Sequence, residues 1–154
     1  MFKSVEPISH PSNAIWGPAL WMILHSACER INSKNEESRI WIGLLQSLRY
    51  SLPCPQCKRH YTAYMKGAPF GLITKENIRR WLYLLHEQVN GRTDKPSFSP
   101  NQLEQYEQPF HFTKYYAIVQ HHMLMSVRQG VSAHSDVQRT LRFLTEMKCF
   151  YDFF

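Results

Sequence analysis

Long apolar runs are missing from this chain of 154 residues. The most apolar stretch, residues 14–24, is interrupted by Gly17-Pro18 and is shorter than the roughly 20 residues that a membrane-spanning helix needs. Residues 1–11 contain one early lysine and no apolar core, so we expect no signal peptide. The sequence therefore predicts a cytoplasmic protein with no membrane partner.

Cysteine is also scarce, and the four thiols are Cys28, Cys54, Cys57 and Cys149. In a protein made in a reducing compartment, four cysteines are more often catalytic or metal-binding than part of a disulfide framework. Cys28 is expected to be a small buried hydrophobe. Cys149 lies in an aromatic C-terminal segment and is either docked on the core or a mobile thiol that relays electrons.

Runs of like charge are absent, although the formal net charge is +6, from 18 basic and 12 acidic residues. The basic residues are scattered, with no block of five or six, so we expect no nucleic-acid partner. A basic surface would instead favour an anionic cofactor or an acidic partner.

No segment alternates with a period of two residues, and the apolar residues recur at helical spacing. The sequence therefore predicts an all-α bundle with a real core, since 44% of the residues are hydrophobic. The first helix should turn Ile15, Leu20, Ile23, Leu24 and Ala27 to its apolar side. Four helices are expected to begin at residues 13, 35, 54 and 75. The first ends near 32, the third near 66 and the fourth near 91, and the second carries apolar residues through Leu48. Three more helices cover 102–107, 112–128 and 135–149.

The segment Cys54-Pro55-Gln56-Cys57 is the most informative one. Pro55 suits the first turn of a helix, and the positive end of the helix dipole favours a thiolate at Cys54. Lys58 and Arg59 add positive charge, and Cys57 shares a helix face with His60 and Tyr61.

Three interpretations of this motif are open. The pair is a redox disulfide, or it is half of a zinc site with His60 and a fourth ligand such as His86, or it is two buried thiols without a function. Positions i, i+3 and i+6 turn by about 300° around a helix, so Cys54 and His60 would converge on a metal only loosely. We favour the redox pair.

Two further polar pairs have i, i+4 spacing, Trp21 with His25 and His86 with Asn90. Each pair alone is more often core or surface than ligand. Together with the thiols they place hydrogen-bonding groups on three helices of one bundle, where planar cofactors bind. Lys95 follows in a loop and could neutralise a phosphate. The adjacent His121 and His122 point to different helix faces, so we expect no shared metal there.

Over residues 13–107 the chain resembles the ALR/Erv-type flavin-dependent sulfhydryl oxidases. Four ordered blocks carry the resemblance: residues 16–25 (Trp-Gly-Pro-Ala-Leu-Trp-Met-Ile-Leu-His), 53–61 (Pro-Cys-Pro-Gln-Cys-Lys-Arg-His-Tyr), 81–90 (Trp-Leu-Tyr-Leu-Leu-His-Glu-Gln-Val-Asn) and 95–98 (Lys-Pro-Ser-Phe). The resemblance implies a four-helix bundle with a short fifth helix that cradles FAD, and usually a homodimer. It also divides the chain into a lead-in (1–12), a FAD-binding bundle (13–107) and a C-terminal helical extension (108–154).

The resemblance also assigns roles to residues. The family's W-x-x-x-H matches Trp21 and His25, its C-x-x-C-x-x-H matches Cys54, Cys57 and His60, and its H-x-x-x-N matches His86 and Asn90. Lys95 matches the lysine expected near the FAD phosphates. The predicted catalytic residues are Cys54 and Cys57, and the predicted cofactor-binding residues are Trp16, Gly17, Trp21, His25, Cys57, His60, Tyr61, His86, Asn90 and Lys95, with no metal ligand.

The chain departs from the family at several positions. Glu87 replaces a common asparagine after His86, and the two positions of a frequent structural disulfide fall at Tyr83 and Pro100. The family's tryptophan after the fifth helix has no clean match, and Tyr106 is one position away. Shortened members of this kind, without the disulfide, are similar to those encoded by large cytoplasmic DNA viruses.

We therefore expect an FAD-dependent thiol oxidase that forms disulfide bonds in protein thiols through Cys54–Cys57 and passes electrons through FAD to oxygen, giving hydrogen peroxide. A viral member would act in the host cytoplasm and the virion. The alternative is a zinc-stabilised helical interaction module built on Cys54, Cys57, His60 and His86. A third candidate is a helical adaptor whose aromatic tail binds a partner.

Overall fold

The computed structural model describes residues 10–153, and within this range the chain is helical without strands. The predicted all-α class is therefore confirmed. The elements are α1 (Asn13–Cys28), α2 (Asn35–Ser51), α3 (Pro55–Tyr64), the short 3₁₀ helix η1 (Met65–Gly67), α4 (Lys75–Arg92), the 3₁₀ helix η2 (Pro100–Glu107), α5 (Phe112–Arg128) and α6 (His134–Phe150). Of the predicted lead-in 1–12, residues 1–9 lie outside the described range.

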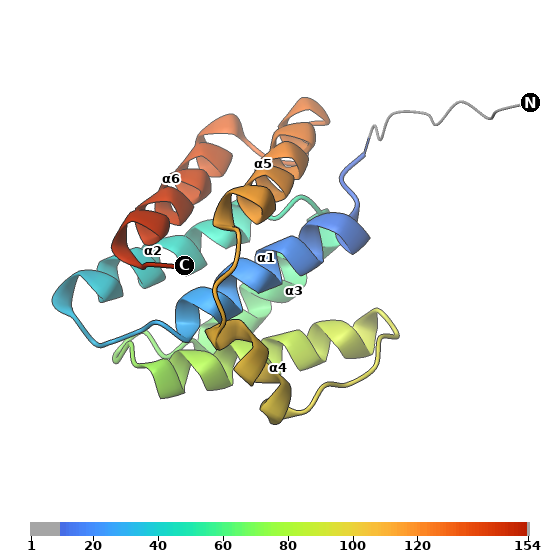
Figure 1. The fold of residues 1–154 in the computed structure, drawn as a ribbon. Helices are drawn as coiled ribbons and strands as arrows, with labels where there is room; N and C mark the ends of the chain where they lie inside the picture. The colour runs from blue at the N-terminus through green and yellow to red at the C-terminus, as the bar shows by residue number, and fades with distance from the viewer. Residues whose placement is uncertain (1–9, 154) are drawn as a thin grey trace, which may run out of the picture.

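Helices α1 and α2 occupy the middle of the molecule (Figure 1). On one side α5 packs along α1 and α6 along α2, and on the other α3 contacts α2 while α4 and η2 contact α1. One continuous apolar core joins these layers and includes the fully buried Trp41, Leu44, Ile78 and Leu144. Residues after 108 thus pack directly on the helices that carry the predicted site.

Local chemistry explains several helix ends. The Thr74 hydroxyl accepts a hydrogen bond from the Asn77 N–H at the start of α4, and Pro55 and Pro100 stand in first turns, where a missing N–H has no helical partner to lose. The turn between α5 and α6 contains Gly130 with φ +73°, a left-handed conformation that glycine adopts without steric penalty.

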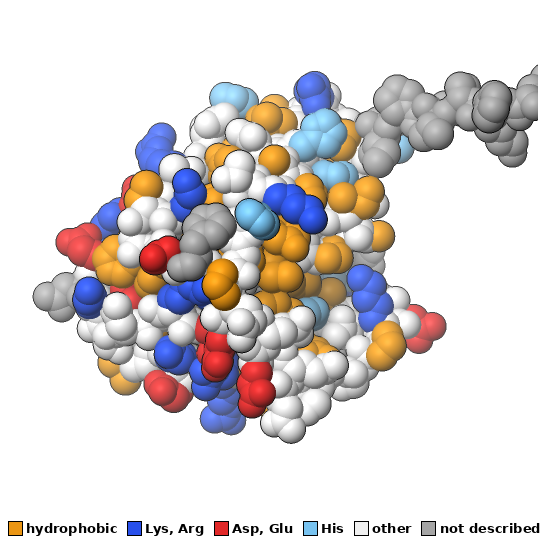
Figure 2. All heavy atoms as spheres, in the orientation of Figure 1, with side chains coloured by type: hydrophobic (Ala, Val, Ile, Leu, Met, Phe, Trp, Pro, Cys, Tyr) orange, Lys and Arg blue, Asp and Glu red, His pale blue; other side chains and the backbone are white. Residues whose placement is uncertain are grey.

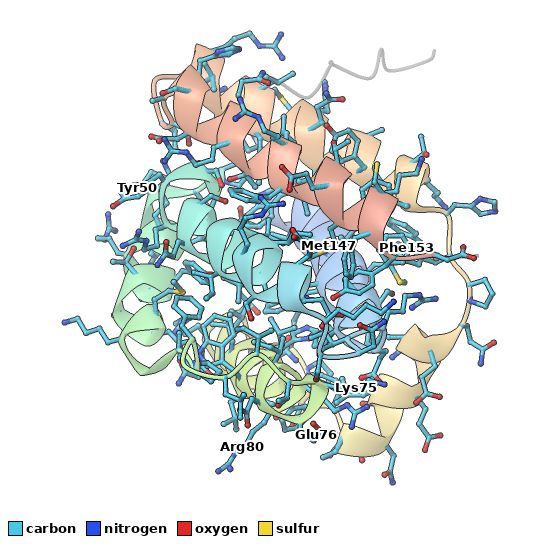
Figure 3. All side chains as sticks on the ribbon, turned by 90° about the vertical axis from the view of Figure 1, so that its left-hand side faces the viewer. Tyr50, Lys75, Glu76, Arg80, Met147 and Phe153 are labelled. Carbon is cyan, nitrogen blue, oxygen red and sulfur yellow. The ribbon has the colours of Figure 1, made fainter. Side chains whose placement is uncertain are left out.

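The contact between α2 and α6 combines apolar packing with buried hydrogen bonds. The Thr140 hydroxyl lies 2.8 Å from the Ser47 hydroxyl and 2.6 Å from that of Ser51, and the Trp41 indole N–H donates to the Tyr151 hydroxyl at 2.9 Å. Figure 3 shows this side of the molecule, with Met147 and Phe153 close to the helices beneath α6; both are buried.

Two details of the sequence prediction are wrong. Ile15 is 40% exposed, and Trp16 takes the buried position beside it. Helix α1 ends at Cys28 rather than near residue 32, because the chain tightens into a turn in which the Arg30 N–H donates to the Ala27 carbonyl, and Ser33 then adopts φ +63°. The short fifth helix exists, but as 3₁₀ helix η2.

No helix in the described part of the chain is both long enough and apolar enough to cross a bilayer. On the face shown in Figure 2, Lys and Arg side chains are spread among acidic and polar ones rather than gathered into one patch.

Candidate active site

The thiol pair lies at the N-terminus of α3. Cys54 is the N-cap residue, and its sulfur accepts a hydrogen bond from the Cys57 backbone N–H at 3.2 Å. Both side chains are free thiols and partly buried against the core. Because the helix begins at Pro55, the two sulfurs of the C-x-x-C motif lie together at its N-terminus. The unpaired N–H groups there stabilise negative charge on sulfur.

The two thiols differ in acidity. Burial raises the pKa of Cys54, but hydrogen bonds from the Cys57 side chain and N–H and from the Asn13 amide outweigh burial, so its pKa lies below the ordinary value. Burial and the neighbouring Cys54 raise the pKa of Cys57 to about 12. The pair thus loses its first proton from Cys54, and the Cys57 thiol then donates to the Cys54 thiolate.

Asn13, at the start of α1, is a site residue that the sequence did not reveal. Its amide nitrogen lies 3.7 Å from the sulfurs of both Cys54 and Cys57. The Trp16 indole N–H donates to the Asn13 Oδ1 at 2.9 Å and so holds the Asn13 side chain in place. Trp16, one of the predicted cofactor residues, is itself buried. No sequence signal connects Asn13 to thiols more than forty positions away.

A second group of aromatic rings comes from α1, α4, η2 and the loop before η2. Trp21 and His86 stack with centroids 4.1 Å apart and planes 9° apart, and His25 stacks on Tyr106 at 4.7 Å. The Phe98 ring lies 4.7 Å from His86. Trp21, His25 and His86, which the sequence predicted as one site, are therefore in contact, and Tyr106 joins them.

The two histidines of this cluster are neutral at pH 7. His25 Nε2 and His86 Nδ1 are 3.0 Å apart. Burial, followed by the charge of His86, lowers the pKa of His25 to about 3. Burial also lowers the pKa of His86 to about 4, and Lys95 adds to this while Glu87 opposes it. Two neutral imidazoles among aromatic rings offer a flat group both stacking surfaces and hydrogen-bonding edges.

The loop after α4 is fastened without a disulfide. The Tyr83 hydroxyl donates to the Phe98 carbonyl at 2.8 Å, and the two rings pack at 5.1 Å. The Glu87 carboxylate accepts from the Ser97 hydroxyl and, at 3.0 Å, from the Phe98 N–H. Tyr83 and Glu87, two positions where the chain departs from the family pattern, therefore hold the loop that contains Lys95.

The remaining predicted residues are placed as follows. Asn90 is buried, and its carbonyl accepts from the N–H of Lys95, whose side chain is exposed. Tyr61 is buried with its hydroxyl bonded to the Leu45 carbonyl at 2.5 Å, and His60 is partly buried on α3. A methyl group on Gly17 would meet no atom within 4 Å. Their roles toward a cofactor stay predictions.

The zinc interpretation finds no support in this geometry. Among residues 10–153, no three His, Cys, Asp or Glu side chains are grouped as metal ligands. His86, the proposed fourth ligand, lies against His25 instead.

Comparison with known proteins agrees with the resemblance. The chain belongs to the Erv1/Alr family, whose model matches residues 18–110. It is 33% identical over 88 residues to protein 088R of Frog virus 3 (isolate Goorha) and 29% identical over 85 residues to protein R368 of Acanthamoeba polyphaga mimivirus, both named as FAD-linked sulfhydryl oxidases. It is also 26% identical over 87 residues to the FAD-linked sulfhydryl oxidase ERV1 of Oryza sativa subsp. japonica.

These matches are partial. They cover 53%, 52% and 53% of this chain and 58%, 59% and 43% of the viral and rice relatives, respectively. The chain thus spans about half the length of the curated relatives it matches. No solved structure matches it.

Proposed function

We propose that this protein is an FAD-dependent thiol oxidase that forms disulfide bonds in protein thiols. The observation that carries the proposal is the thiol pair at the start of α3, in which hydrogen bonds make Cys54 the more acidic thiol. Membership of the Erv1/Alr family, whose named viral relatives are FAD-linked sulfhydryl oxidases, supports the same chemistry.

The residues present fit a flavin dinucleotide. The Trp21, His25, His86, Phe98 and Tyr106 rings offer stacking surfaces, and the two neutral imidazoles offer hydrogen bonds to a flat heterocycle. Trp81, whose ring contacts Tyr61 and Tyr64 of α3, has a buried indole N–H without a partner within the described residues. Lys95 supplies a cation for phosphate. Trp16, Gly17, His60, Tyr61 and Asn90 are the other residues we assign to FAD. Bound FAD would supply the two-electron acceptor that reoxidises the dithiol.

The protein's own steps are thiol–disulfide exchange. A substrate thiolate attacks the Cys54 sulfur of the Cys54–Cys57 disulfide, a new S–S bond forms, and Cys57 leaves as a thiolate. A second substrate thiolate then attacks the substrate sulfur of this mixed disulfide. Cys54 leaves as a thiolate, which its lowered pKa favours, and the substrate departs with a disulfide while the enzyme holds two thiols.

Three further parts of the proposal concern partners and place. Oxygen is the final electron acceptor and hydrogen peroxide the product. The protein is a homodimer. Since α5 and α6 cover one side of α1 and α2 and α4 covers the other side of α1, a second copy would meet the outer face of α4 and the loop before it, where Leu84 and Leu72 are exposed. It acts in the cytoplasm, and for a viral member in the host cytoplasm and virion.

An absorbance scan of the purified protein and a Cys57→Ser variant test the function. The full chain should be yellow and should consume thiols with release of peroxide. Cys57→Ser should keep the flavin band but lose turnover, because no disulfide can form with Cys54. A colourless chain that refuses FAD on reconstitution, or full activity in the variant, would contradict the proposal; unfolding by a chelator would favour the zinc module.

A further inference from the structure

We infer that Asn13 is a catalytic residue of the thiol pair, donating a hydrogen bond to whichever sulfur is negative during disulfide exchange, and that α5 holds it in place. This inference rests on the proposed function. The family motif contains Cys54, Cys57 and His60. Among the described residues, none of these three side chains donates a hydrogen bond to both sulfurs.

The orientation of the Asn13 amide follows from its partners. An indole N–H can only donate, so the atom of Asn13 that faces Trp16 Nε1 at 2.9 Å must be the oxygen. The nitrogen, with its two hydrogens, therefore faces the thiols, 3.7 Å from each sulfur. These N···S distances suit a hydrogen bond to the large sulfur atom. Asn13 can thus serve either thiol without turning its amide.

The backbone just before Asn13 is anchored by the C-terminal part of the chain. The Ser12 N–H donates to the Nδ1 of His122 in α5 at 3.0 Å, and His122 is buried. The α5–α6 turn also contacts α3 next to the thiol pair, because the ammonium group of Lys58, the residue after Cys57, donates to the Val131 carbonyl at 2.5 Å. The extension therefore fixes both the residue before Asn13 and a residue of α3. His122 is a positioning residue for Asn13.

The two exchange steps place negative charge on different sulfurs. Cys57 is the leaving thiolate in the first step and Cys54 in the second. A single amide with one N–H for each sulfur stabilises both leaving groups, whereas the Cys57 backbone N–H bonds only to Cys54. Hydrogen bonds to a charged acceptor are stronger than those to a neutral one, so the amide favours the thiolate form.

The test measures thiol reactivity and needs no flavin turnover. The reduced full-length chain is alkylated with iodoacetamide across a range of pH, and peptide mapping reports Cys54 and Cys149 separately. Asn13→Ala should raise the Cys54 pKa by roughly half a unit to one unit and slow its alkylation at neutral pH roughly three- to tenfold. The exposed Cys149 is the internal reference and should not change.

A second variant keeps the contact with Trp16. Asn13→Asp retains an oxygen for the indole N–H but replaces the donor with a charged acceptor, so the Cys54 pKa should rise further than in Asn13→Ala. Asn101→Asp makes the same change at an exposed position of η2. An unchanged Cys54 profile in Asn13→Ala, or an Asn13→Asp effect no larger than that of Asn101→Asp, would overturn the inference.

The anchoring by α5 has its own comparison. His122→Leu should shift the Cys54 pKa in the same direction as Asn13→Ala, while His122→Asn, whose side-chain oxygen can accept from Ser12, should restore it. Combining His122→Leu with Asn13→Ala should add little to Asn13→Ala alone, because both act through one amide. Fully additive shifts would refute the positioning role. Failure of the oxidase proposal would instead appear as absent flavin, with these thiol pKa shifts intact.

Discussion

His25 is 2% exposed and shares a 3.0 Å contact with His86, so two titratable side chains lie inside an aromatic cluster. Such a contact is favourable only while at least one imidazole accepts a hydrogen bond, which a doubly protonated pair cannot do. Trp21 stacks on the partly buried His86, and Tyr106 stacks on the buried His25. The cluster is thus a neutral, flat surface at physiological pH and a source of instability in acid.

The free energy of unfolding should therefore fall as the pH drops from 6.5 toward the folded pKa values of His86, about 4, and His25, about 3. Both folded pKa values lie below the unfolded 6.5, so the unfolded chain binds more protons and is favoured as the pH drops. For the buried His25 alone this amounts to about 2 kcal/mol between pH 7 and 5. Urea unfolding of the flavin-free chain at both pH values measures it. The double variant His25→Gln with His86→Gln should lose most of this difference; an unaltered slope would speak against the pair.

At the residue scale, the sequence predicted which side chains belong to the site better than it predicted which residues hold them in place. Trp21, His25 and His86 could be grouped from helical spacing and family motif, and they do meet. Asn13 and Tyr83 could not, because their partners depend on how distant segments pack. The prediction that Ile15 is buried was wrong, because its larger neighbour Trp16 is the residue that packs into the core at the start of α1.

Among the elements, α2 and α6 are in tight contact at Gly43. The ring of Phe143 covers this glycine so tightly that an added methyl group would overlap it. Thr140 fixes the same pair of helices through Ser47 and Ser51. The register of α6 on α2 is therefore set by one small residue and one buried hydroxyl cluster.

Gly43→Ala should destabilise the fold by about 1–2 kcal/mol, because overpacking at the Phe143 ring outweighs the gain of roughly 1 kcal/mol in helix propensity. Thermal and urea unfolding give the value. Gly91→Ala, in α4 with open space around it, should instead stabilise by up to about 1 kcal/mol. Equal stabilisation by both substitutions would show that Phe143 does not restrict Gly43.

Most elements could be predicted from apolar spacing and from the residues at helix starts, such as Thr74 before α4 and Pro55 in α3. Helix α5 has the predicted bounds, 112–128. The end of α1 could not be foreseen, since nothing in Glu29-Arg30 prevents a helix. Arg30 leaves helical register because its guanidinium group donates to carbonyls of η2 and of the C-terminus.

In the whole molecule, Arg30 connects three regions. Its guanidinium donates to the carbonyls of Ser26 in α1, Tyr106 in η2 and Asp152 near the C-terminus, and it lies 5.2 Å from the centroid of the Phe153 ring. The ring of Tyr106 stacks on His25. The C-terminal segment is therefore joined to the aromatic cluster as well as to the thiol pair.

Deleting residues 108–154 tests whether the predicted bundle 13–107 is an independent unit. Trp41 Nε1, Ser47 and Ser51 would lose buried partners, and the apolar sides of α1 and α2 would face water. We expect the truncated chain to aggregate or to pair through this newly exposed side. Light scattering after gel filtration would then give a larger mass for it than the full-length chain has, and circular dichroism a lower unfolding temperature. A truncated chain that keeps the full-length oligomeric state and unfolding temperature would show that α5 and α6 are an accessory layer.

The same mass measurement tests the dimer proposal. The full chain should have twice the monomer mass. Leu84→Lys, on the side of the molecule that α5 and α6 do not cover, should reduce the mass to that of one chain.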